Sequence, residues 1–217
     1  MAIKPILFNT EMVRAILDGR KSCTRRLVKP QPDEKHTYPL GFVTDSTEKK
    51  EVGCFGFGID EYGGSIQYTK SPYQPGHTLY VRETVWQKTG HYLDVDGETK
   101  AVWCSEFKYV ASDEKPETGW NYSWAKRPSI HMPKEAARIW LKVTDVRVER
   151  LQEMWASDAS KEGLQFNKPT TADEMLQAFA ELWNSTIKKS DLDRYGWDAN
   201  PWVWVIEFER CEKPEGV

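Results

Sequence analysis

Residues 19–26 read Gly19-Arg20-Lys21-Ser22-Cys23-Thr24-Arg25-Arg26 and form the densest cluster of reactive side chains in the sequence. A threonine hydroxyl becomes a nucleophile when a neighbouring base takes its proton, and a lysine is such a base when burial leaves it neutral. Lys21 and Thr24 are close enough to meet across a turn, although on an ideal extended strand they face opposite sides. Cys23 is a rival nucleophile. The alternative interpretation is a basic surface turn with no catalytic function.

The residues before and after this turn predict a strand, a helix and a second strand. Residues 6–8 are a short apolar run, and Asn9 or Thr10 is suited to cap the helix that follows. The apolar residues of this helix share one face, and Gly19 is expected to end it. A second strand is expected from the basic turn to near Pro30.

The C-terminal third has the clearest periodicity. Residues 138–148 alternate as a strand, and Ser157 is expected to cap a short helix that reaches Glu162 and stops at Gly163. Residues 171–174 form a capping box before an amphipathic helix. A final strand is expected to place Trp202, Trp204, Ile206 and Phe208 on one face.

Glu162 has an unusual position for a helix carboxylate. In the last turn its charge opposes the helix dipole, so its presence is not explained by helix stability. Glu162 is therefore a candidate to face a cationic partner or a substrate. The alternative is a surface glutamate of no consequence.

The middle of the chain is less regular. Residues 31–75 predict loops and short hairpins, residues 78–86 a strand, and Asp96-Gly97 the turn of a further hairpin. Residues 105–128 are expected to be irregular. Strands and helices alternate without a regular βαβ rhythm, so we predict an α+β fold around a mixed sheet or small barrel. We expect one domain over residues 1–217, with insertions at about 31–74 and 88–128.

Composition excludes several classes of protein. The chain has 217 residues, 39% of them hydrophobic, which is enough for a sizeable core and argues against wholesale disorder. The net charge of −3 argues against a protein that coats polyanions, although residues 1–30 carry seven cations and two anions. No apolar run is long enough to span a membrane, and the N-terminal residues lack the long apolar stretch and small-residue cleavage site of a signal peptide, so we expect a cytoplasmic protein.

Metals and cofactors are not expected. The four cysteines are far apart and lack zinc-ligand spacing, so reduced and mostly packed thiols are predicted. The glycines at 56 and 58 are not followed by the remainder of a nucleotide-binding loop. We therefore predict no metal and no cofactor.

Eight of the ten tryptophans fall into two groups. Those in periodic elements are predicted to be core, namely Trp140, Trp183, Trp202 and Trp204. Those at strand ends or in loops are candidates to stack on a nucleobase beside arginines, or else to cover small cores: Trp86, Trp103, Trp120 and Trp124. Arg82, within an apolar strand, and Ser129 and His131, beside Pro133, are further polar residues among aromatics. His131 is expected to be half-buried.

Taken together, several segments resemble the ASCH family, a branch of the PUA-like β-barrel superfamily. The matching core segments are 15–25, 75–82, 143–146, Leu151, 159–163 and 204–208. A longer form of the match, typical of ASCH proteins from phages and prophages, adds residues 127–133 and 200–205. The resemblance implies a PUA-like mixed β-barrel with flanking helices and inserted loops and hairpins.

The resemblance also implies an activity. Small bacterial ASCH enzymes remove the acyl group from N4-acetylcytidine with a lysine, a threonine and a glutamate, which fall on Lys21, Thr24 and Glu162. In the implied mechanism Lys21 deprotonates Thr24, and Glu162 positions the lysine or relays a proton to the leaving amine. The residues predicted to bind substrate, some of them to stabilise the oxyanion, are Arg20, Arg25, Arg82, Trp86, Ser129 and His131.

The sequence thus predicts an amidohydrolase that acts on N4-acylated cytosine nucleosides. The alternatives are a non-catalytic RNA- or DNA-binding PUA-like module, a ribonuclease-like ASCH protein, and a phage assembly protein with a vestigial pocket. A small-molecule nucleoside is the expected partner, with short RNA or DNA as the second candidate and no membrane. This chain is about twice as long as the small ASCH enzymes, so its insertions are expected to cover or reshape the pocket.

Overall fold

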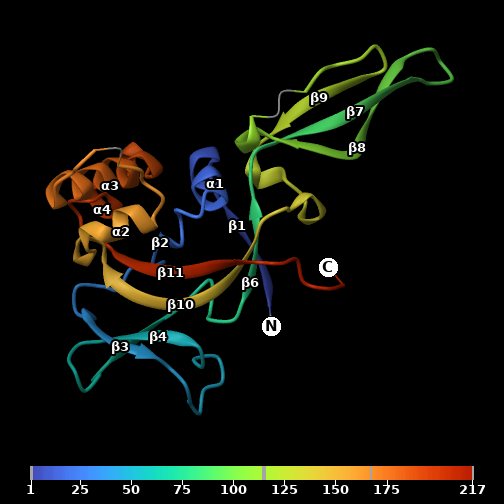
Figure 1. Cartoon of the computed structure of the whole chain (residues 1–217). Coiled ribbons are helices and arrows are strands. Elements are labelled where there is room, and N and C mark those ends of the chain that lie inside the picture. The colour runs from blue at the N-terminus through green and yellow to red at the C-terminus, as the bar shows by residue number, and fades with distance from the viewer. Residues whose placement is uncertain (1, 114–115, 167, 217) are drawn as a thin grey trace. The chain divides into compact units, whose positions relative to one another are not determined.

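The computed structural model describes residues 2–113, 116–166 and 168–216 (Figure 1). It combines helices with a larger share of strands, which confirms the predicted α+β content. The chain divides into two compact units. Unit 1 holds residues 1–21, 77–142 and 209–217, and unit 2 holds residues 22–76 and 143–208. The strands β10 (Trp140–Arg150) and β11 (Trp202–Cys211) contribute residues to both.

Unit 1 begins with β1 (Ile3–Leu7), which pairs in parallel with β6 (Thr78–Arg82). The strand β6 pairs antiparallel with the first residues of β10. Helix α1 (Thr10–Leu17) starts at Asn9, whose side chain accepts a 2.8 Å hydrogen bond from the backbone N–H of Met12. Gly19 follows the helix with φ +74°, a conformation that glycine adopts without strain. The predicted Asn9 cap and Gly19 stop are confirmed.

A second sheet in unit 1 has the order β8-β7-β9 and is antiparallel throughout (Figure 1). Its strands are β7 (Val85–Leu93), β8 (Thr99–Tyr109) and β9 (Tyr122–Arg127). The predicted hairpin at Asp96-Gly97 is confirmed as the turn between β7 and β8. Single 3₁₀ turns are formed by η1 (Val110–Ser112), η2 (Ser129–His131) and η3 (Lys134–Ala136).

Two predictions for unit 1 are wrong. The strand predicted over 78–86 is interrupted, because β6 ends at Arg82 and β7 begins at Val85. The segment 105–128 is not irregular throughout, because it contains the end of β8 and all of β9. Both of these strands take their hydrogen-bond partners from β7, which local sequence does not reveal. Residues 114 and 115 of the insertion predicted at 88–128 lie outside the described residues.

Unit 2 contains β2 (Cys23–Leu27) and a three-stranded antiparallel sheet of order β3-β4-β5. The bounds of that sheet are β3 (Tyr38–Phe42), β4 (Cys54–Gly58) and β5 (Ile66–Lys70). The helices of the unit are η4 (Leu151–Glu153), α2 (Ala156–Lys161), α3 (Ala172–Thr186), η5 (Lys189–Asp191) and α4 (Leu192–Tyr195). Helix α3 starts with the predicted Thr171–Glu174 capping box. Helix α2 instead follows Trp155, so the predicted Ser157 cap is wrong.

The strand β11 organises the core of unit 2 because both of its faces are buried there. On one face the Trp204 ring lies 5.9 Å from the ring of Phe55, and the Trp202 ring lies 5.2 Å from that of Phe57. On the other face Val203 and Val205 pack in a cluster with Cys23, Leu151, Met154, Ala159, Phe179 and Trp183. The predicted core tryptophans, Trp140, Trp183, Trp202 and Trp204, are all buried.

Other expectations about the architecture are not decided by these features. Three of them stay predictions: the PUA-like barrel, the single domain, and the insertions at about 31–74 and 88–128. Within the part of the chain that the structure describes, no helix combines the length and apolar character needed to cross a membrane.

Candidate functional site

The turn after α1 holds the predicted base, Lys21, in unit 1. The backbone N–H groups of Arg20 and Lys21 both donate to the carbonyl oxygen of Ala15, at 2.9 and 3.0 Å. These bonds fold the chain back on the end of the helix. The Lys21 side chain is buried, and its ammonium nitrogen lies 5.5 Å from the centre of the Phe8 ring. The guanidinium of Arg20, a predicted substrate contact, donates to Asp18 at 2.8 Å.

The predicted nucleophile, Thr24, belongs to unit 2 and is the second residue of β2. The strand pairs antiparallel with β11, which places Thr24 opposite Ile206 and Arg25 opposite Val205. Cys23 packs in the cluster with Phe179, and the Arg25 guanidinium carbon lies 5.9 Å from the Phe179 ring. Strand alternation therefore directs Cys23 and Arg25 to one face of β2 and Thr24 to the other. Because β2 begins at Cys23, this alternation does not extend to Lys21.

Arg25 is the centre of a buried ionic cluster in unit 2. Its guanidinium donates to Asp158 at 2.9 Å, to Glu162 at 3.3 Å and to Glu149 at 3.4 Å. The Arg25 side chain is only 1% exposed, and those of Asp158 and Glu162 are 8% and 6% exposed. Helix α2 supplies Asp158, and Glu162 is the residue that caps its C-terminus. Glu162 therefore lies beside a cation, which accounts for a carboxylate at this end of a helix.

The charged groups in this cluster shift one another's pKa values. Burial acts to lower the pKa of Arg25, but the charges of Glu162 and Cys23 and the hydrogen bond to Asp158 raise it above its ordinary value. Burial acts to raise the pKa of Asp158, but hydrogen bonds from Lys161 and Arg25 lower it below its ordinary value. Both groups are therefore held in their charged forms. Burial lowers the pKa of the neighbouring Arg26.

The lowered pKa of Asp158 predicts a loss of stability in acid. The stabilisation is complete above the ordinary pKa of 3.8 and declines as the pH falls through the lower pKa of the folded state. We expect Asp158→Asn to reduce the free energy of unfolding at pH 7, and the difference from the natural protein to shrink at pH 3. Urea unfolding at the two pH values measures both quantities. The exposed Asp193→Asn is the control, and equal Asp158→Asn penalties at both pH values would contradict the assignment.

Three of the predicted substrate contacts are brought together within unit 1. The Arg82 guanidinium donates to the backbone oxygens of Ile130 and Met132, the latter at 2.9 Å. Arg82 thus holds the 3₁₀ turn η2, which carries Ser129 and His131. Ser129 is half-buried, whereas His131 is exposed and not half-buried as predicted. Whether any of them contacts a substrate stays a prediction.

The remaining predicted contact, Trp86, is the second residue of β7 and lies near the start of that strand. The ammonium of Lys126 lies 5.8 Å from the centre of its ring. Trp103 and Trp124 are also within strands, β8 and β9 respectively, which corrects their predicted placement at strand ends or in loops.

The predicted site omits two charged residues that the structure shows to be buried and ion-paired, Asp158 in the Arg25 cluster and Glu83. Asp158 and Glu162 are four residues apart, a spacing at which like charges repel on a helix unless a cation lies between them. This spacing was a usable signal for the Arg25 cluster. In unit 1 the buried Glu83 accepts two hydrogen bonds from Arg138, at 2.9 and 3.0 Å. Among the described residues, no group of three or more His, Cys, Asp or Glu side chains is arranged to hold a metal ion.

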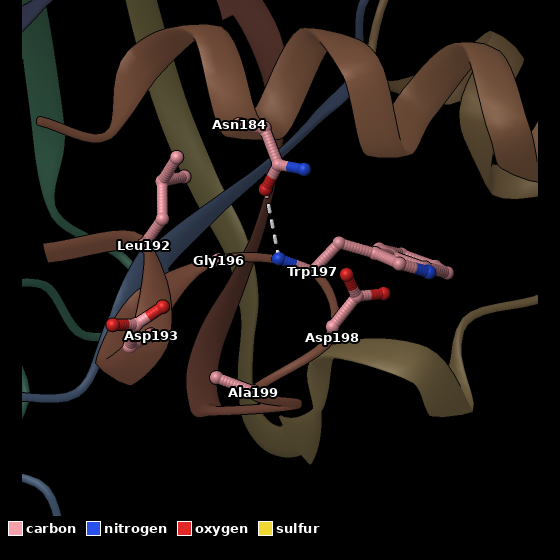
Figure 2. Close-up of a pocket in the computed structure, with 7 residues that line it drawn as sticks. All are labelled: Asn184, Leu192, Asp193, Gly196, Trp197, Asp198 and Ala199. Carbon is pink, nitrogen blue, oxygen red and sulfur yellow. Dashed lines mark hydrogen bonds between the residues drawn. The ribbon is translucent and has the colours of Figure 1, made fainter. Parts of the chain in front are cut away.

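Figure 2 shows a pocket of about 360 Å³ in unit 2, beside α3 and α4. Its lining residues are Asn184, Leu192, Asp193, Gly196, Trp197, Asp198 and Ala199. The Asn184 side chain accepts a 2.8 Å hydrogen bond from the backbone N–H of Trp197, which fixes the wall of the pocket. None of the predicted site residues lines it.

These features define a mixed α+β protein with a buried threonine on β2 and a buried ionic cluster around Arg25. No protein-family model matches the chain, and no curated protein matches it. Among solved structures, the ASCH domain from Lactobacillus crispatus is similar at 12% identity, over 96% of this chain and 79% of that one. The TM-score is 0.36, and a likeness this low carries no argument about fold or activity.

Proposed function

We propose that this protein is an ASCH-type amidohydrolase that removes the N4-acyl group from an acylated cytosine nucleoside. The reaction consumes one water and yields cytosine nucleoside and a carboxylic acid. Lys21 acts as the base, Thr24 as the nucleophile, and Glu162 as the carboxylate that positions the lysine or relays a proton. The proposal rests on the sequence match at these three residues and on their burial.

The observation that carries the proposal is the burial of all three residues. As whole residues, Lys21, Thr24 and Glu162 are 4%, 5% and 5% exposed, respectively. Lysine and glutamate are almost never this buried without a partner, because removing a charge from water is costly. The alternatives from sequence were a basic surface turn and a surface glutamate of no consequence. Both would leave these residues exposed to solvent.

The chemistry follows from these three groups. Lys21 in its neutral form takes the Thr24 hydroxyl proton while the threonine oxygen attacks the acyl carbonyl carbon. The resulting tetrahedral intermediate collapses, the C–N bond breaks, and the exocyclic amine leaves with a proton returned by the lysine or through Glu162. Water then hydrolyses the threonine ester and releases the carboxylic acid. Each group ends in its starting protonation state.

Arg25 takes a different role in this proposal from the one expected from sequence. Its guanidinium is 1% exposed and binds three carboxylates. We therefore assign it as a positioning residue that fixes the Glu162 carboxylate. Arg20 and Arg82 remain the proposed contacts for substrate or oxyanion, together with Trp86, Ser129 and His131.

Incubation of the full chain with N4-acetylcytidine tests the proposal. We expect conversion to cytidine and acetate in equal amounts, followed by the change in ultraviolet absorbance and by chromatography. N4-methylcytidine is the matched control, because it carries an alkyl group with no carbonyl to attack. Absence of conversion of N4-acetylcytidine and its longer N4-acyl analogues would contradict the proposed function.

A further inference from the structure

The β8-β7-β9 sheet of unit 1 has a local charge that differs from that of the whole chain. Its strands contain five cations, Lys88, Lys100, Lys108, Lys126 and Arg127, and one anion, Glu106. The chain as a whole has a net charge of −3. A basic sheet in an acidic chain indicates a surface suited to a polyanion.

One face of this sheet alternates aromatic rings with lysines. Strand pairing places Trp86 opposite both Lys108 and Lys126, and Lys88 opposite Trp124. Residues directly opposite each other point to the same face. The next pair along the strands is Gly90 and Tyr122. Trp86, Trp124 and Tyr122 therefore share a face with three lysines.

Contacts between the side chains confirm that these residues share a face. The ammonium nitrogen of Lys88 lies 4.8 Å from the centre of the Tyr122 ring. The ammonium nitrogen of Lys108, on β8, lies 5.4 Å from the centre of the Trp124 ring, on β9. Because β7 lies between these two strands, the Lys108 side chain reaches across β7. The glycine at position 90 adds no side chain between the rings.

The face is also hollowed. A groove of about 390 Å³ is lined by Lys88, Glu106, Lys108, Glu117, Tyr122 and Trp124. Tyr122 and Trp124 are two residues apart on β9, which separates them by about 7 Å. This spacing leaves room for a separate planar ligand to stack on each ring. The acidic residues are Glu106, which binds Lys88 at 2.9 Å, and Glu117 at the rim.

We propose that this face, the aromatic–lysine face of Trp86, Lys88, Lys108, Tyr122, Trp124 and Lys126, binds single-stranded nucleic acid. Bases stack on the exposed parts of the rings, and the lysines, whose flexible stems move readily from ring to phosphate, neutralise the backbone. Aromatic rings in a row on an open antiparallel sheet suit unpaired bases, whereas a duplex hides its base faces. This face lies on the β8-β7-β9 sheet of unit 1, and the proposal does not depend on the proposed hydrolase, although Trp86 is also one of the hydrolase's proposed substrate contacts.

Binding of fluorescein-labelled single strands of about eight nucleotides, RNA and DNA in separate arms, tests this proposal by fluorescence anisotropy. We expect Trp124→Ala to weaken binding at least about fivefold, since each stacked base contributes at this level, without changing the salt dependence. Lys108→Ala and Lys126→Ala are each expected to lower the slope of log K against log salt by about 0.7. Glu106→Gln is expected to tighten binding, because it releases Lys88.

Trp155→Ala is the matched control, because Trp155 is 79% exposed but belongs to unit 2. It is expected to bind as the natural protein does. Equal losses in Trp124→Ala and Trp155→Ala, equal affinity for duplex DNA or heparin, or no binding in either arm would each overturn the proposal. Hydrolysis of N4-acetylcytidine by Trp124→Ala is expected to be unchanged, so failure of one proposal leaves the other standing.

Discussion

Thr24→Val is expected to lower kcat/KM for N4-acetylcytidine by at least about 10³-fold, because the side chain that forms the covalent intermediate is lost. Valine has the shape of threonine, so the packing around this buried position is kept. The free energy of unfolding is therefore expected to change far less than the activity. Steady-state kinetics and urea unfolding on the same preparation separate the two effects.

Two further variants distinguish Thr24 from its neighbours. Thr24→Ser keeps a hydroxyl at the same position and is expected to retain measurable hydrolysis. Cys23→Ala removes the rival nucleophile, which the structure buries in the cluster with Phe179, and is expected to leave hydrolysis within a few-fold of the natural protein. Full activity in Thr24→Val, or loss of activity only in Cys23→Ala, would contradict the assignment of Thr24.

Local sequence predicted the elements whose signals lie within a few residues. The Asn9 cap, the glycine after α1 and the Thr171 capping box all depend on neighbours three or four residues away. The two buried faces of β11 follow from alternation along a single strand. In each case the determining interaction is local or periodic, so a sequence shows it directly.

The failed predictions share a dependence on distant residues. The strand over 78–86 breaks at Glu83, whose partner Arg138 is 55 positions away. The strand β9 is short and rich in polar residues, and its place in a sheet depends on β7. Ser157 has a side chain suited to capping, but the N-cap of α2 is two residues earlier, at Trp155.

The sequence identified the residues of the candidate site by their chemical type, but it did not reveal the contacts between them. Burial of Lys21, Thr24 and Glu162 agrees with their selection from sequence, but their catalytic roles stay predictions. The identity of the cation that pairs with Glu162 was not predicted from the sequence. Arg25 lies next to Thr24 in sequence, yet it is 137 positions from Glu162, and no periodicity joins the two. The position of Glu162 against the helix dipole indicated a cationic partner, and the like charges of Asp158 and Glu162 four residues apart point the same way.

Arg25→Met is expected to reduce the free energy of unfolding by about 3–5 kcal/mol, because it leaves two buried carboxylates without their shared cation. Methionine retains an unbranched apolar stem, so lost packing contributes less than lost charge. Urea unfolding at pH 7 measures the change. An exposed ion pair provides the control, because Lys50 lies 3.5 Å from Glu48 with both side chains mostly in solvent. Lys50→Ala is expected to cost less than about 1 kcal/mol.

The source of this penalty is tested by removing the charges that Arg25 balances. If the carboxylates that lose the Arg25 charge cause the drop in stability, then adding Asp158→Asn and Glu162→Gln to Arg25→Met restores most of the stability, since neutral amides are cheaper to bury than charges. The triple variant is also expected to lose hydrolysis, because Glu162 no longer carries a charge. A triple variant no more stable than Arg25→Met would instead show that Arg25 stabilises unit 2 by packing against Phe179 and not by its charge.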